Sequence, residues 1–185
     1  ACEYREHQRQ AGMTPDHGAN FVLTMFVAME DPGLIVLPTH RLFRGVPELS
    51  AEELAARLGD RFTCNAGGEG PEAADAVWEE IETRGDQGTL GLFTTKDRRW
   101  TLATVTPAGQ ARMAEIAEDH NPEWQALGVA LLHRLLVDDC LAPPAPKELP
   151  KPDYVHRVDE LVSGLHTGEF PLAALVMPAT VEDVR

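Results

Sequence analysis

The residues best suited to chemistry stand together in the tetrapeptide Pro38-Thr39-His40-Arg41. They follow an apolar run, Leu34 to Leu37, which predicts a buried strand. Polar groups at the end of a core strand often bind ligands; arginine binds carboxylate or phosphate, and histidine transfers protons near neutral pH. We therefore take His40 as the candidate catalytic residue and Thr39 and Arg41 as candidate ligand-binding residues. The structural alternative is a strand that simply reaches solvent, with Arg41 paired to an acid.

Other candidate motifs favour structural roles. Gly67-Gly68-Glu69-Gly70 lacks the lysine of a phosphate-binding loop and predicts a turn, and Asp119-His120 offers only two metal ligands in a predicted helix connection. We therefore predict no metal site. Three cysteines without a Cys-x-x-Cys spacing indicate free thiols in a reducing compartment. A Cys–His nucleophile pair stays open, because only the fold decides which side chains meet.

The length and composition suit a globular protein. The chain has 185 residues, of which 43% are hydrophobic, and its longest apolar run, Phe21 to Met29, is too short to cross a bilayer. Without a signal-peptide pattern, the expected location is the cytoplasm, with no membrane partner. The chain begins at Ala1, and helix-prone segments at both ends predict a fragment cut from a longer protein.

The charge is strongly acidic. Thirty acidic against sixteen Lys and Arg residues give a net charge of -14, which argues against a nucleic-acid partner. Eleven acidic residues and only three basic ones lie between Glu48 and Asp86. This segment predicts a solvated face, with a surface for cations or a basic partner as the alternative.

The elements that must position these residues can be predicted from periodicity and turn chemistry. Phe21 to Met29 and Leu34 to Leu37 predict a hairpin buried on both faces, joined by Asp31-Pro32-Gly33 as a type II turn. A second hairpin is expected from Thr89–Thr95 and Trp100–Val105. Between the two hairpins, Arg61 to Cys64 indicates a short strand, followed by a glycine-rich loop over Asn65 to Gly70.

Helices are expected where capping residues precede an apolar stripe. Ser50 with Glu53 fits a capping box, Pro71 opens a second helix, and Thr106-Pro107 opens a third. Asn121-Pro122 begins the strongest predicted helix, whose stripe runs through Leu136. His133 lies beside this stripe and is interpreted as a boundary histidine.

The C-terminal part predicts a β-α-β unit after a proline-rich connector, Ala142 to Pro152. Its strands are expected at Tyr154–Arg157 and Leu172–Met177. We predict an α+β fold with a mixed sheet, built from two β-hairpins and this late β-α-β unit and covered by helices. The predicted division is a main region, residues 1–145, and a segment, residues 146–185, packed on the same sheet.

Several stretches resemble one prokaryotic family, known as the domain of unknown function 1015 family. The segment from Met29 to Arg41, Met-Glu-Asp-Pro-Gly-Leu-Ile-Val-Leu-Pro-Thr-His-Arg, resembles its signature. Agreement extends to three further segments, Asn20–Val22, Leu127–His133 and Ala173–Val184, so that the similarity runs over essentially the whole chain. It strengthens the expectation of a ligand role for Thr39, His40 and Arg41.

The resemblance also points to a more distant superfamily. Full-length members carry an Asp-Gly-His-His-Arg-Tyr motif just upstream of the helix that Ala1 to Arg5 resembles, and this motif is similar to the nucleotide-contacting box of ParB and sulfiredoxin proteins. The motif is absent from this chain, so none of its residues can be assigned to that box. What the resemblance implies is a nucleotide, with Mg²⁺, as cofactor of the full-length protein.

These observations leave three hypotheses for the function. The first is a nucleotide-dependent small-molecule enzyme, with phosphotransfer as the suggested reaction and a small molecule or nucleotide as ligand. The second is a non-catalytic scaffold or interaction domain. The third, which the acidic charge disfavours, is a DNA-associated regulatory protein. The oligomeric state, the substrate and the nucleotide are not determined by the sequence.

Overall fold

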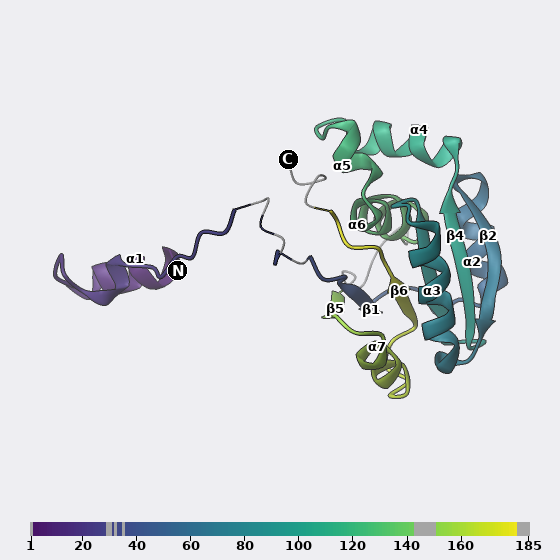
Figure 1. Ribbon diagram of the computed structural model, residues 1–185, viewed down its shortest axis with the longest axis horizontal. Coiled ribbons are helices and arrows are strands. Elements are labelled where there is room, and N and C mark those ends of the chain that lie inside the picture. Colours follow the sequence, from purple (N-terminus) through teal and green to yellow (C-terminus); the bar gives the residue numbers. More distant parts are fainter. Residues whose placement is uncertain (1, 29–30, 32, 35, 143–150, 181–185) are drawn as a thin grey trace. The chain divides into compact units, whose positions relative to one another are not determined.

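The computed structural model describes residues 2–28, 31, 33–34, 36–142 and 151–180. The chain divides into two compact units, Ala1–Ile35 and Val36–Arg185. The first unit contains helix α1 (Cys2–Gln10), the short 3-10 helix η1 (Gly18–Asn20) and an extended segment. The second unit contains a sheet and the helices that cover it (Figure 1). The helix-prone N-terminal segment does form a helix, over Cys2–Gln10.

Six strands of the second unit form one sheet, in the order β2-β4-β3-β6-β1-β5. Their bounds are β1 (His40–Arg44), β2 (Phe62–Glu69), β3 (Thr89–Thr94), β4 (Arg99–Val105), β5 (Lys151–Val155) and β6 (Leu172–Leu175). The predicted α+β class is confirmed. The expected mixed sheet is wrong, because every paired neighbour in this sheet is antiparallel.

Helices cover both faces of the sheet and divide the core into two clusters. One face, called the η4 face here, packs against five helices: α2 (Ala51–Leu58), α4 (Pro107–Ile116), α5 (Pro122–Ala126), α6 (Gly128–Ala130) and the π-helix η4 (Leu131–Cys140). The other, called the α3 face, packs against α3 (Ala74–Arg84) and α7 (Val158–Leu165). Two short 3-10 helices, η2 (Gly59–Arg61) and η3 (Pro71–Ala73), precede β2 and α3.

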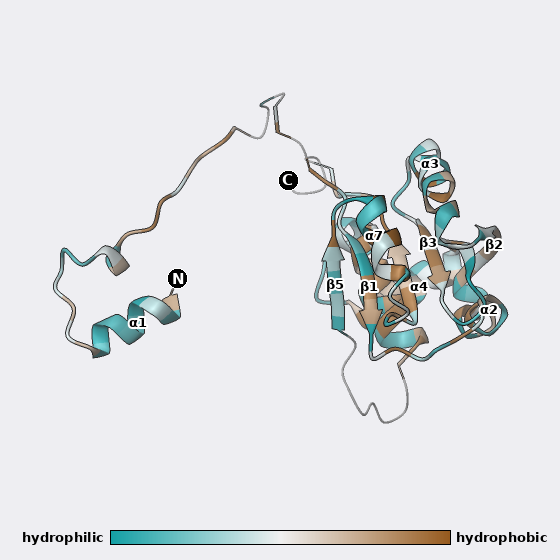
Figure 2. Ribbon diagram, turned by 90° about the horizontal axis from the view of Figure 1, so that it is seen from below, coloured by the Kyte–Doolittle hydropathy of each residue, from teal (hydrophilic) through white to brown (hydrophobic). Residues whose placement is uncertain are grey.

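The first expected hairpin does not form within the described residues. Residues 21–28 are extended without strand pairing, and Figure 2 shows that this segment is mostly hydrophobic. Most of its apolar side chains are exposed, from 46% at Val27 to 101% at Leu23. Asp31 does make a turn, since its carbonyl accepts from the Leu34 N–H at 2.9 Å, but Pro32 lies outside the described residues. The strand of this region is β1 instead, which begins three residues after Leu37 and pairs with β5 on one side and β6 on the other.

The second hairpin is confirmed as β3 and β4, which pair from Thr89↔Thr104 to Thr94↔Arg99. The predicted loop over Asn65 to Gly70 is wrong, because β2 continues to Glu69 against β4 with a bulge between Ala66 and Gly68. A Cβ at Gly67 would lie 3.1 Å from Trp100 Cβ. The glycines of this segment therefore permit close packing within the sheet.

The predicted capping motifs are confirmed. Ser50 and Glu53 form a reciprocal capping box at α2, with Glu53 Oε2 accepting from the Ser50 N–H at 2.7 Å. Thr106 caps α4, and its Oγ1 accepts from the Gly109 N–H at 3.2 Å. Ser, Thr and Glu in these positions satisfy backbone N–H groups that a helix start leaves unpaired.

The single long helix expected from Asn121 is wrong, because the chain breaks at Leu127 into α5, α6 and η4. Leu127 has extended backbone angles, φ -63° and ψ 135°. The freed N–H of Gly128 donates to Gln87 Oε1 at 3.0 Å, so a side chain from a distant segment stabilises the break. The stripe residues Leu131, Leu132, Leu135 and Leu136 are nevertheless buried, as predicted.

The late β-α-β order is present as β5, α7 and β6, but β1 lies between the two strands in the sheet. Both strands run antiparallel to β1, and β6 also pairs with β3. Most of the proline-rich connector, residues 143–150, and the helix expected at 181–185 lie outside the described residues. No helix in the described part of the chain is both long and apolar enough to cross a membrane.

Candidate functional site

The candidate residues lie at the beginning of a strand, and not after the end of one as expected. Thr39 is half-buried just before β1, and His40 and Arg41 are its first two residues. His40 is 0% and Arg41 8% exposed, so both ionisable side chains are part of the interior. The strand that positions them continues into Leu42 and Phe43, which fill the core on both sides.

His40 and Arg41 point to opposite faces of the sheet, because successive side chains of a strand alternate. Their neighbours agree with this alternation. His40 lies against Trp78 of α3, and Leu42 belongs to the cluster on the same α3 face. Arg41 lies over Tyr154 of β5, its cross-strand partner, and Phe43 belongs to the cluster on the η4 face. The structure therefore does not bring His40 and Arg41 to one common ligand.

His40 is held by two contacts on the α3 face. Its Nδ1 accepts from the Val176 N–H at 3.4 Å, and its ring meets Trp78 edge-on at a centroid distance of 4.7 Å. Burial, followed by the nearby Arg41 charge and His156, lowers the pKa of His40 to about 4. The ring is therefore neutral at pH 7, and since Nδ1 accepts, its proton is assigned to Nε2.

The His40 Nε2–H is buried without a hydrogen-bond partner. A neutral histidine with a protonated Nε2 can donate to a ligand oxygen, but cannot at the same time bind a metal through that nitrogen. Among the described residues no cluster of three or more His, Cys, Asp or Glu side chains could hold a metal ion.

Arg41 is the least satisfied charged group of the described part of the chain. Both Nε and Nη1 are buried without a hydrogen-bond partner. Its guanidinium carbon lies 5.3 Å from the centroid of the Tyr154 ring, which supplies a weak cation–π contact. Burial lowers the pKa of Arg41, and Tyr154 opposes this effect. The guanidinium nevertheless stays charged at any physiological pH.

Arg44 provides an internal comparison on the same strand. It donates to Asp153 at 2.6 Å and Glu169 at 2.7 Å, and it lies 4.0 Å from the centroid of the Phe170 ring. Arg41 has no such carboxylate within the described residues. Arg41 therefore forms no ion pair with an acidic residue of the described part of the chain, contrary to the structural alternative.

His133 is a residue near Arg41 that the sequence did not single out for function. It lies on η4, half-buried, with its ring 5.9 Å from the ring of Phe43. Burial and the charge of Arg41 lower its pKa, while Asp138 opposes them. It is separated from Arg41 by more than ninety positions in the sequence, and its place beside a leucine stripe signals packing only. No sequence pattern joins the two residues.

The remaining candidates have structural roles. His120 stacks on Trp124 at 3.6 Å and lies 3.6 Å from Asp119, as expected for a helix connection. Burial raises the pKa of the Cys64 and Cys140 thiols, so both are protonated and poorly nucleophilic at pH 7.

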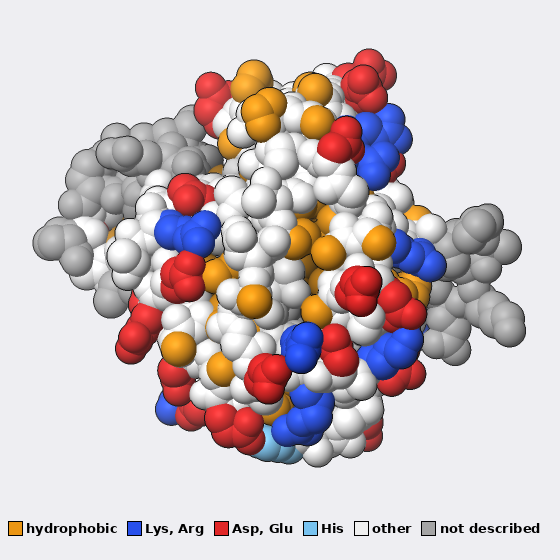
Figure 3. Space-filling model, turned by 90° about the vertical axis from the view of Figure 1, so that its right-hand side faces the viewer, with side chains coloured by type: hydrophobic (Ala, Val, Ile, Leu, Met, Phe, Trp, Pro, Cys, Tyr) orange, Lys and Arg blue, Asp and Glu red, His pale blue; other side chains and the backbone are white. Residues whose placement is uncertain are grey.

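The acidic segment Glu48–Asp86 forms α2, β2 and α3, where several carboxylates pair with bases, including Glu53 with Lys96 at 2.7 Å. Figure 3 shows acidic and basic side chains interspersed over the side that includes α2 and β2.

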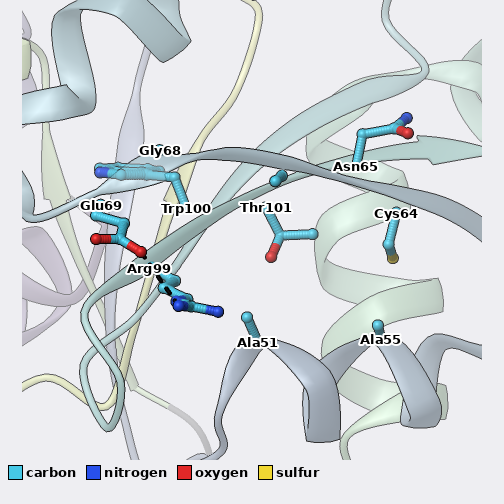
Figure 4. A pocket seen from close by; sticks show the side chains of 10 residues that line it. Ala51, Ala55, Cys64, Asn65, Gly68, Glu69, Arg99, Trp100 and Thr101 are labelled. Carbon is cyan, nitrogen blue, oxygen red and sulfur yellow. Dashed lines mark hydrogen bonds and ion pairs between the residues drawn. The ribbon is translucent and has the colours of Figure 1, made fainter.

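Two cavities lie away from the candidate residues. One, of about 320 Å³, lies between α2 and the sheet; Cys64 and Thr101 point into it, and Arg99 pairs with Glu69 at its edge (Figure 4). The other, of about 440 Å³, is lined by Gln87, Gln125 and Met113 among others. Neither is lined by Thr39, His40 or Arg41.

Comparison with known proteins identifies a family. The sequence model of a family described as "Protein of unknown function (DUF1015)" matches residues 1–130. The match includes Thr39, His40 and Arg41, and ends within α6, before His133. No curated protein and no solved structure is detectably similar to the chain.

Proposed function

The chain belongs to this family of unknown function, as the segment from Met29 to Arg41 predicted, and we propose that it binds an anionic, phosphate-bearing small molecule through Arg41. The single observation that carries the proposal is the guanidinium of Arg41, whose Nε and Nη1 are buried without an acceptor. An anion would give this guanidinium both the hydrogen-bond acceptors and the negative charge that it lacks.

The energetics support an anion at this position. A buried donor without a partner costs about 1–3 kcal/mol, and a charged group costs more. Residue 41 carries two such donors, together with a positive charge that no described carboxylate compensates. A phosphate or carboxylate would supply the missing acceptors through charge-assisted hydrogen bonds, which are the strongest that arginine makes. The superfamily resemblance favours phosphate over carboxylate.

Within a complete enzyme, Arg41 would neutralise charge on a phosphate of a nucleotide or phosphorylated substrate. Phosphoryl transfer depends mainly on such cationic contacts and on Mg²⁺, so the proposal fits a nucleotide-dependent phosphotransferase. His40 remains the proposed catalytic residue, but its side chain lies on the α3 face of the sheet and that of Arg41 on the η4 face. It would therefore act apart from the anion that Arg41 holds, as a neutral hydrogen-bond donor on the α3 face.

Thermal unfolding of the full chain tests the proposal. Inorganic phosphate, pyrophosphate, ATP, ADP and CTP are added with and without Mg²⁺. At about one hundred times the Kd, a ligand stabilises the folded state by about 2.7 kcal/mol. For a chain of this size this amounts to a rise in Tm of about 5–10 °C. We expect at least one phosphate-bearing compound to give such a shift.

Two variants identify the residue responsible. Arg41→Met removes the charge while keeping an unbranched side chain, and should abolish the shift. Without ligand it should be as stable as wild type or more stable, by up to about 1–3 kcal/mol, because an unpaired buried charge is removed. Arg57→Met, on an exposed helix position, should keep the shift. The proposal fails if no compound stabilises wild type, or if Arg41→Met responds like wild type.

A second candidate function is the non-catalytic interaction domain. The observation that favours it is the extended segment Phe21–Val27, in which Phe21, Leu23, Met25 and Phe26 are each more than two-thirds exposed. Contiguous exposed apolar side chains of this kind mark surfaces that contact other polypeptides. A protein of this second type should associate through the segment and lose that association when the segment is removed.

A further inference from the structure

We propose that His133 completes the Arg41 site as a second contact for the same anion, and that it takes up a proton when the anion binds. This inference rests on the proposed anion binding by Arg41. It adds a residue from a different element, and it makes binding depend on pH.

The geometry places His133 on the same side of the sheet as Arg41. Arg41 and Phe43 are two positions apart on β1, so their side chains share the η4 face. The His133 ring meets the Phe43 ring at a centroid distance of 5.9 Å and an interplanar angle of 64°. His133 is also close enough to Arg41 for the two to interact electrostatically. The histidine therefore lies beside Phe43 on the η4 face, the face to which Arg41 points.

The element that carries His133 has an unusual geometry. Residues 131–140 form a π-helix, and at its end the Leu141 N–H donates to the Leu136 carbonyl at 2.9 Å, five residues back. π-Helical turns are rare in proteins, and those that do occur are often found at functional sites. Here the helix buries Leu132, Leu135 and Leu136 in the core while His133 is only half-buried. The imidazole therefore lies at the border between the core and solvent, where a proton can reach it.

The charges around His133 favour the neutral ring until an anion arrives. Burial lowers the pKa of His133, and from β1 the charge of Arg41 lowers it further. From its own helix, Asp138 raises the pKa, but that carboxylate lies 3.6 Å from Arg134. Tyr154 of β5 is the titratable group that lies against Arg41 itself. An anion beside Arg41 would compensate the guanidinium charge and favour the charged imidazole.

The direction of the pH dependence follows from this change. His133 has a higher pKa in the anion complex than in the free protein, so the complex binds more protons. Anion affinity therefore rises as the pH falls through the range in which the histidine titrates. For the uptake of one proton the increase is at most about tenfold per pH unit.

Inorganic sulfate is the probe, because it remains a dianion from pH 6 to pH 8 and adds no titration of its own. Sulfate is titrated into the full chain by calorimetry at about pH 6 and about pH 8, the pH values that bracket the usual histidine pKa. Wild type should bind roughly ten times more tightly at the lower pH, within the limit that one proton sets. At pH 6 the binding enthalpy should change between buffers of different ionisation enthalpy, which reports proton uptake directly.

Three variants separate the possible outcomes. His133→Gln should bind sulfate more weakly at pH 6 and with little pH dependence, whereas His7→Gln, an exposed histidine on α1, should behave like wild type. Arg41→Met should bind at neither pH. If wild type binds no anion, or if Arg41→Met binds like wild type, the proposed function fails.

If Arg41 is required but His133→Gln keeps the wild-type pH dependence, only the present inference is overturned. The proposed role of His133 is also overturned if the sulfate-binding enthalpy of the wild-type protein at pH 6 is the same in all buffers. This measurement does not depend on whether the His133→Gln variant folds.

Discussion

At the scale of single residues, two arginines on one strand show how surroundings decide a role. Arg44 is half-exposed and is bound by two carboxylates, so it acts as a structural cross-link between β1, β5 and the segment before β6. Arg41 is buried and has no acceptor among the described residues. The sequence around them does not reveal the difference, because both arginines stand beside apolar residues. Unsatisfied buried charge is costly, and such cost is commonly retained where a ligand binds.

His40 makes a prediction about stability and pH. Its pKa is about 4 in the folded protein, below the value near 6.5 of an unfolded chain. The unfolded state therefore binds more protons between these values, and the free energy of unfolding falls as the pH decreases through that range. We expect His40 to account for a loss of about 2 kcal/mol between about pH 7 and pH 5.

Urea unfolding at the two pH values measures this loss in wild type and in His40→Asn, whose side-chain oxygen can still accept from the Val176 N–H. The loss should be smaller by about 2 kcal/mol in the variant. His7→Asn, on the exposed face of α1, should keep the wild-type loss. An unchanged pH dependence in His40→Asn would show that the ring titrates normally and is not held neutral by burial.

At the scale of elements, helix α3 packs closely on the sheet at a position that glycine leaves free of a side chain. Gly91 in β3 faces α3, and a Cβ there would lie 2.9 Å from Ile81 Cδ1 and from Val77 Cγ1. It would also lie 3.3 Å from Leu175 Cβ of the neighbouring β6. The α3 helix can therefore pack directly on the sheet only because residue 91 has no side chain. The same helix carries Trp78, the ring partner of His40.

Gly91→Ala should move α3 away from the sheet and destabilise the protein by about 1–3 kcal/mol, the usual cost of overpacking a core. Chemical denaturation measures the change in the free energy of unfolding. Gly18→Ala is the matched control, because a Cβ at Gly18 meets nothing within 4 Å. Equal stability of the two variants would contradict the packing argument for Gly91.

At the scale of the whole chain, the two units differ in what they bury. All six strands and both hydrophobic clusters belong to Val36–Arg185. In Ala1–Ile35, none of the described residues is buried. A segment without buried apolar side chains contributes little to the stability of a fold.

The fragment Val36–Arg185 should therefore unfold cooperatively, with a Tm within about 3 °C of the full chain. Light scattering on the full chain should reveal association through Phe21–Val27 that the fragment lacks. The double variant Leu23→Lys with Phe26→Lys should also lose the association while keeping residues 1–35. Loss of cooperative unfolding in the fragment would mean that Ala1–Ile35 does stabilise the sheet.

The sequence predicted local structure well where a few adjacent residues provide the cause. The capping residues Ser50, Glu53 and Thr106 satisfy N–H groups within their own first turn, and the β3–β4 hairpin brings together segments that are close in sequence. The leucine stripe after Asn121 also predicted burial correctly. The break at Leu127 could not be predicted, because the acceptor for the freed Gly128 N–H is Gln87, forty-one residues before Gly128.

For the candidate site too, the sequence predicted some features and only the tertiary structure revealed the others. The sequence by itself determined the family and the α+β class, and it proposed Thr39, His40 and Arg41 as candidates. Only the tertiary structure decided that β1 begins at His40, that His40 and Arg41 face opposite sides, and that His133 lies beside Phe43 on the Arg41 side. The physical reason is that strand pairing and burial depend on contacts between distant segments. Such contacts decide which polar groups lose water and which of them find a partner.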